Sequence, residues 1–123
     1  MQKIAAHLPE STSSETTIRT IKGWLDECSS SHTCSHKNGK HAHQQQASPK
    51  RLLQISNDTV VLQENTGQQR YACLSYCWGD SAQITKTTGE NIEDHQRNIP
   101  LNQLNATFRD AITVCRSLGV SYL

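Results

Sequence analysis

Apolar positions first become regular in residues 15–28. They recur every three or four residues, which places them on one face of an α-helix. These positions are Ile18, Ile21, Leu25 and Cys28. Trp24 flanks the stripe, and Thr12 precedes Glu15 by the three residues of a capping box. The pattern therefore predicts a helix that begins close to Thr12.

A polar stretch follows at residues 29–49. It opens with Ser29-Ser30-Ser31, contains the turn signal Asn38-Gly39 and includes three consecutive glutamines. Such a composition buries too little apolar surface to offset the entropy cost of ordering the chain. We therefore expect a loop here, with poor order between Lys37 and Ser48.

Two short apolar runs after Pro49 favour a β-hairpin. The first run is Leu52, Leu53 and Ile55, and the second is Val60, Val61 and Leu62. Asn57-Asp58 lies between them and suits a two-residue turn, although Asn-Gly would be a stronger signal. The sequence predicts two antiparallel strands joined at this dipeptide.

The segment Tyr71 to Trp78 is the densest in aromatic and apolar residues. Strand alternation would place Tyr71, Cys73, Ser75 and Cys77 on one face, and Ala72, Leu74, Tyr76 and Trp78 on the other. Because both faces are largely apolar, we predict an interior strand that is buried on two sides. The expectation includes core positions for Trp78 and both cysteines, and a buried Ser75 bonded to the backbone.

Helical spacing returns near the C-terminus. The apolar positions are Phe108, Ala111, Ile112, Cys115 and Leu118. Asn105 is placed to cap the helix at its start, and Gly119 stands where helices commonly end. A shorter helix is predicted around Gly89 to Gln96. Val120 to Leu123 then starts an apolar run typical of another strand, so we expect the sequence to be a truncated part of a longer fold.

These elements predict an α/β or α+β fold with an incomplete sheet and flanking helices. Residues 1–49 form a leader with one helix and a polar loop, and residues 50–123 hold the sheet and its helices. Hydrophobic residues make up 34% of the chain and mean hydropathy is −0.65, which allows only a modest core. Apolar strand edges left open in such a fold favour aggregation.

Composition excludes several classes of protein. No run approaches the roughly 18 apolar residues of a membrane span, and the N-terminus lacks the apolar stretch of a secretory signal. The net charge is +1, and neither half carries the basic stripe that nucleic-acid binding needs. Five cysteines without a secretory signal favour reduced thiols in the cytoplasm.

The stretch Tyr71-Ala72-Cys73-Leu74-Ser75-Tyr76-Cys77-Trp78-Gly79 resembles the hallmark of the fungal heterokaryon incompatibility (HET) domain. Further stretches resemble other blocks of the family: Pro49-x-Arg51-Leu52, Thr107 to Ile112 with Arg109 and Asp110, and Leu118 to Leu123. The motif residues carried over are Tyr71, Leu74, Ser75, Tyr76, Trp78, Gly79, Arg109 and Asp110. We expect the hallmark to form an interior strand, and the attribution to the family depends on this prediction.

The resemblance implies a fungal effector of non-self recognition and innate immunity that promotes programmed cell death, acting by assembly with partners or with itself. The chain would be the N-terminal portion of such a domain. The family has also been compared with the TIR fold, some of whose members cleave NAD. The alternative is therefore a nucleotide hydrolase that takes NAD as substrate, with a crevice near Asp80.

One group of four residues and one single aspartate suggest chemistry. Cys28, His32, Cys34 and His36 supply the donor types of a structural zinc site, but they lack the paired Cys-x2-Cys of ordinary zinc fingers. We favour a core cysteine and polar loop histidines over zinc. Asp80 follows the motif glycine at the carboxyl end of the predicted strand, where open α/β sheets bind ligands. Capping of the following turn is the simpler role for Asp80.

Three other positions carry weaker signals. Ser75 lacks both a nucleophile elbow and an identifiable base. Glu93-Asp94-His95 are adjacent on a predicted helix and so cannot face one another, which favours a solvated surface. For Arg109 and Asp110 we expect ion pairs at the surface or in packing rather than ligand contacts.

Overall fold

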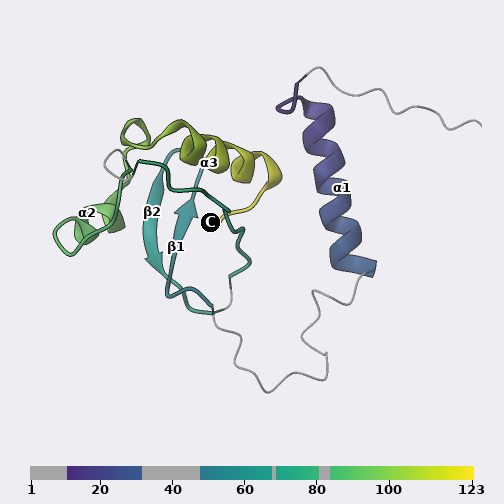
Figure 1. The fold of residues 1–123 in the computed structure, drawn as a ribbon. Coiled ribbons are helices and arrows are strands. Elements are labelled where there is room, and N and C mark those ends of the chain that lie inside the picture. Colours follow the sequence, from purple (N-terminus) through teal and green to yellow (C-terminus); the bar gives the residue numbers. More distant parts are fainter. Residues whose placement is uncertain (1–10, 32–47, 68, 81–83) are drawn as a thin grey trace, which may run out of the picture. The chain divides into compact units, whose positions relative to one another are not determined.

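A computed structural model describes residues 11–31, 48–67, 69–80 and 84–123 of the chain. The chain divides into two compact units, Met1–Gln45 and Gln46–Leu123. Figure 1 shows the elements of both units. Most of the predicted loop at residues 29–49, including its poorly ordered part up to residue 47, lies outside the described residues.

The first unit contains helix α1, Glu15–Ser31, which confirms the helix predicted from the apolar stripe. The helix begins after Ser14, whose Oγ accepts a hydrogen bond from the Thr17 backbone N–H at 3.2 Å. The prediction that Thr12 caps the helix is wrong, because the nearer hydroxyl takes that role. The start of the predicted loop is also wrong, since Ser29 to Ser31 form the last turn of α1.

Helix α1 buries none of its side chains within the described residues. Trp24 remains 65% exposed and Leu25 remains 42% exposed. An exposed ion pair joins Arg19 and Glu15 at 2.7 Å across one helical turn. The described part of the helix therefore leaves Trp24 and Leu25 exposed, while Ile18, Ile21 and Cys28 are partly buried.

The second unit is built on the predicted hairpin of strands β1, Arg51–Ile55, and β2, Val60–Glu64. The strands are antiparallel, with Leu53 opposite Leu62 and Ile55 opposite Val60. The turn closes when the Ser56 N–H donates to the Thr59 carbonyl at 2.9 Å, which leaves Asn57-Asp58 at the tip as predicted. This register puts Leu53, Ile55, Val60 and Leu62 on one face of the hairpin, and Leu52 and Val61 on the other.

The C-terminal residues lie along the other edge of β1. Leu53 and Leu123 exchange both backbone hydrogen bonds, at 2.9 and 3.0 Å, and the Ile55 N–H donates to Ser121 at 2.7 Å. Only a single bridge, Gln54 to Tyr122, has regular strand geometry. The strand predicted from Val120 onward is therefore present as a short antiparallel addition to the sheet.

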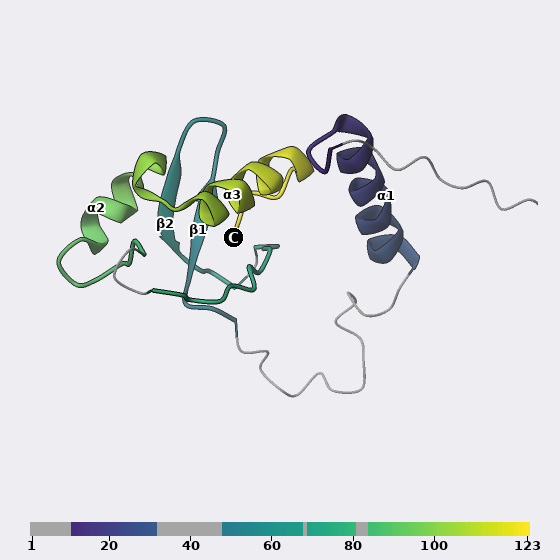
Figure 2. The ribbon, with the colours of Figure 1, turned by 45° about the horizontal axis from the view of Figure 1, so that its top comes forward.

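Helix α3, Ala106–Leu118, packs against the apolar face of the hairpin (Figures 1 and 2). Both predicted caps are confirmed. Asn105 Oδ1 accepts from the Phe108 N–H at 2.9 Å, and Gly119 ends the helix at a φ of 71°, which favours glycine. The core between helix and hairpin consists of Ile55, Val60, Ile99, Leu104, Ile112 and Cys115.

The segment before α3 closes the side of the core next to β2. It contains helix α2, Ile92–Arg97, close to its predicted position, and a 3-10 turn η3, Leu101–Gln103. The Ile99 N–H donates to the Val60 carbonyl at 2.8 Å. His95 is buried and its Nδ1 lies 2.8 Å from Thr87 Oγ1, so the expected solvated surface holds for Glu93 and Asp94 but is wrong for His95.

The described fold therefore mixes helices with a small antiparallel sheet, which confirms the predicted α/β or α+β class. Among the residues that the structure describes, no helix is both long enough and apolar enough to cross a membrane.

Candidate binding surface

The aromatic segment from Tyr71 to Trp78 does not form the predicted interior strand. The structure gives it no regular secondary structure, and most of its side chains are exposed. Trp78 is 58% exposed, Leu74 40% and Tyr71 37%. The prediction of a strand buried on both faces is wrong, and so are the core positions expected for Trp78, Cys73, Cys77 and Ser75.

The reason is that the described residues give the segment almost no strand to pair with. The Ala72 N–H donates to the Tyr122 carbonyl at 2.9 Å, which ties the segment to the C-terminal addition of the sheet. Beyond this bond, no backbone hydrogen bond involves Cys73 to Gly79 in the described part of the chain. A strand needs a ladder on at least one edge, and burial of both faces needs a covering layer on each.

Tyr76 anchors the segment to the start of α3. Its ring lies 4.9 Å from that of Phe108, centroid to centroid, with the planes tilted by 55°. Its hydroxyl accepts a hydrogen bond from Asn105 Nδ2 at 3.1 Å. Asn105 thus caps α3 through its oxygen and holds Tyr76 through its nitrogen. The sequence predicted the cap, but nothing in it signalled the contact with Tyr76, 29 residues away.

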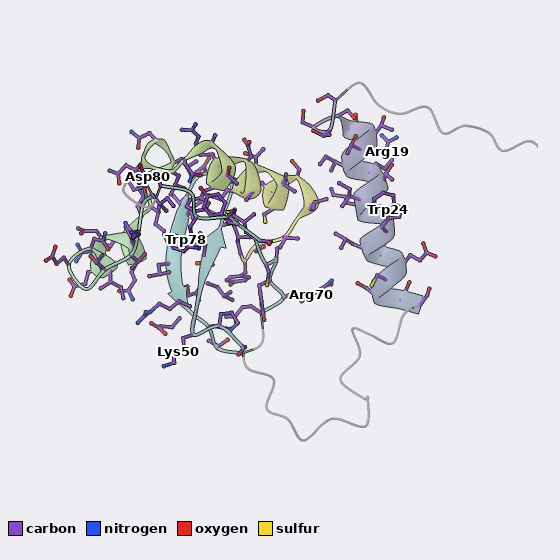
Figure 3. All side chains as sticks on the ribbon, viewed as in Figure 1. Arg19, Trp24, Lys50, Arg70, Trp78 and Asp80 are labelled. Carbon is purple, nitrogen blue, oxygen red and sulfur yellow. The ribbon has the colours of Figure 1, made fainter. Side chains whose placement is uncertain are left out.

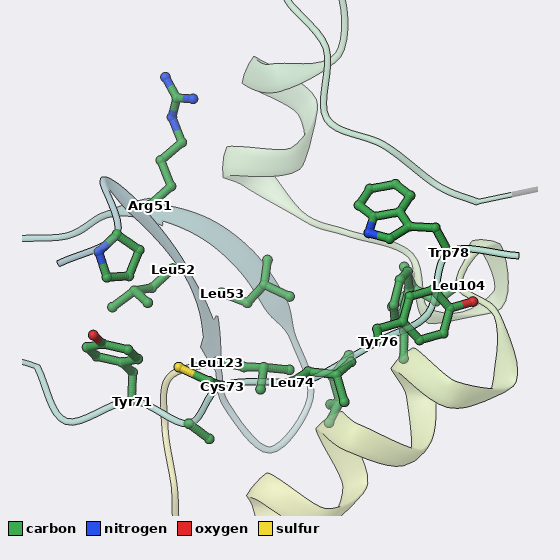
Figure 4. A pocket seen from close by; sticks show the side chains of 14 residues that line it. Arg51, Leu52, Leu53, Tyr71, Cys73, Leu74, Tyr76, Trp78, Leu104 and Leu123 are labelled. Carbon is green, nitrogen blue, oxygen red and sulfur yellow. The ribbon is translucent and has the colours of Figure 1, made fainter. Parts of the chain in front are cut away.

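An open pocket of about 470 Å³ lies between this segment, β1 and α3. Its lining includes six residues of the motif segment: Tyr71, Ala72, Cys73, Leu74, Tyr76 and Trp78. The other lining residues are Pro49, Arg51, Leu52, Leu53, Leu104, Phe108, Ile112 and Leu123. Figure 4 shows Tyr71 and Leu52 at one end, and Tyr76 and Trp78 at the other.

The lining is chemically suited to binding apolar groups. Among the described lining residues the one with a charge is Arg51, whose Nε donates to Glu64 Oε1 at 2.9 Å. None of these described residues carries a carboxylate, an imidazole or a lysine ammonium. Of the side chains that proteins use for general acid–base chemistry, the described lining offers tyrosine and cysteine only. The arrangement therefore offers aromatic and aliphatic contact surface, with tyrosine hydroxyls as polar handles.

The three cysteines of the second unit differ in exposure. Cys73 and Cys77 are exposed, whereas Cys115 is buried in the core, where burial raises the pKa of its thiol above the ordinary value of 9.0. A raised pKa leaves less thiolate at neutral pH, so Cys115 is a poor nucleophile. The thiols open to reaction in this unit are therefore the two on the motif segment.

Asp80 is exposed and lies next to the end of the motif (Figure 3). It follows Gly79, whose φ of 37° is a left-handed conformation that favours glycine. Asp80 does not line the pocket. Its proposed catalytic role stays a prediction.

Arg109 and Asp110 are exposed on α3, away from the pocket lining. Among the described residues neither forms an ion pair, so the ion pairs expected for them are not found. Their place in the family motif is compatible with a surface role.

The zinc hypothesis concerns a different part of the chain. Cys28 lies near the end of α1 and is partly exposed. His32, Cys34 and His36 are outside the described residues, so the proposed zinc site stays a prediction. Within the described ranges, no group of three or more His, Cys, Asp or Glu side chains is placed to hold a metal ion.

Comparison with protein families finds a match in the C-terminal part of the chain. Residues 71–123 match the model described as heterokaryon incompatibility protein (HET), which confirms the resemblance carried by the motif. The match begins at Tyr71, so the hairpin lies outside it. The family match depends on the amino-acid sequence alone. It therefore holds even though the prediction of an interior strand at Tyr71 to Trp78 is wrong. Searches of the curated proteins and of the solved structures found no match to this chain.

Proposed function

Because residues 71–123 match the heterokaryon incompatibility family, we propose that this chain carries the N-terminal portion of a fungal effector domain. In this role it promotes programmed cell death in non-self recognition and innate immunity, and it acts in the cytoplasm by assembly with protein partners. The leader at residues 1–49 precedes the domain. Nucleic acid and membrane take no part in the proposal.

The observation that carries the proposal is the exposed family motif around an open apolar pocket. Trp78, Leu74 and Tyr71 are all exposed, and all three line the pocket. Exposed apolar patches on soluble domains commonly mark interaction sites. Tryptophan and tyrosine supply a large share of the energy at such interfaces. The motif thus fits a contact surface for a protein better than it fits a core.

The rival function is a nucleotide hydrolase with a crevice near Asp80. It would require a carboxylate positioned at the bound sugar or at the attacking water. Asp80 is not among the described residues that line the apolar pocket, and this supports the assembly function over the hydrolase. Loss of cellular NAD on expression, abolished by Asp80→Asn, would favour the hydrolase instead.

Conditional expression of the full chain in fungal cells tests the proposal. We expect growth arrest with the natural sequence, and relief of the arrest by Trp78→Ala. Trp24→Ala is the matched control, because Trp24 is exposed to a similar extent but lies on α1, outside the motif. Growth unaffected by the natural chain, or equal relief by both variants at equal protein levels, would contradict the proposal.

A further inference from the structure

We draw no further inference here: the strongest candidate, the open apolar pocket between the motif segment, β1 and α3, belongs to the surface already proposed for protein contact, and nothing among the residues that the structure describes shows what covers it.

Discussion

Helix α3 and the motif segment both carry apolar residues that were expected to pack in a core, yet only those of α3 reach it. Ile112 on α3 is 1% exposed, whereas Trp78 on the motif segment is 58% exposed. A helix closes its backbone hydrogen bonds within itself and needs a neighbour only for its apolar stripe. A strand needs neighbours for its backbone as well. Apolar composition therefore indicates what a segment would bury, but not whether a partner is present.

The largest difference between the two regions should appear in stability. Ile112→Ala removes a fully buried side chain from the core, so we expect the free energy of unfolding to fall by about 2–5 kcal/mol. Trp78→Ala deletes a larger side chain, but an exposed one, and should change that free energy by no more than about 0.5 kcal/mol. Urea denaturation measures both. A larger loss from Trp78→Ala than from Ile112→Ala would reverse the comparison.

Asn105 links the two regions, and its two roles are separable. Asn105→Ala removes both the cap of α3 and the bond to Tyr76, so we expect a loss of about 1 kcal/mol. Asn105→Asp keeps the acceptor for the cap but removes the donor to Tyr76. We expect Asn105→Asp to retain most of the stability while quenching of Tyr76 fluorescence by solvent increases. Equal destabilisation by both variants would show that the Tyr76 contact, rather than the cap, stabilises the fold.

Gly119 tests how the C-terminal cap stabilises helix α3. Its φ of 71° is costly for any residue with a Cβ, so Gly119→Ala should destabilise the fold by about 1 kcal/mol. Gly89→Ala is the control, because Gly89 has no positive φ and no atom near a new Cβ. Thermal unfolding followed by circular dichroism should show a lower midpoint for Gly119→Ala alone. Equal midpoints for the two variants would contradict the left-handed cap.

The cysteines give the smallest expected effect. At pH 8, a thiol reagent should label the exposed Cys73 and Cys77 quickly, and label the buried Cys115 only on unfolding.

Burial raises the pKa of the Cys115 thiol in the folded chain. The neutral, buried thiol therefore contributes its full stability to the fold below pH 9.0, and this contribution is lost as pH rises above that value. The natural chain should therefore lose more stability above pH 9.0 than Cys115→Val does. Identical pH profiles, or fast labelling of Cys115, would contradict its burial.

Much of the fold could be predicted from the sequence because its signals are local. The periodic stripes, Asn105, Gly119 and the Asn57-Asp58 turn each act within a few residues. One local prediction was wrong, the capping of α1 by Thr12. Ser14 also carries a hydroxyl and lies nearer to the start of the helix, and it is the residue that caps α1.

The candidate binding surface could be predicted only in part. The motif identified residues that line the pocket, but it suggested that they form a core. Their exposure depends on which strands lie beside them, and the spacing of one segment does not contain that information. The burial of His95 against Thr87 and the hold of Asn105 on Tyr76 are likewise contacts between separate segments.

Amide hydrogen exchange of Cys73 to Gly79 tests the central claim, that the family motif is a surface in the free chain, most directly. In dilute solution we predict exchange at nearly the rate of an unstructured peptide, while amides in the interior of α3 are protected. Protection of Cys73 to Gly79 equal to that of α3 in the monomer would show a buried strand and contradict the account.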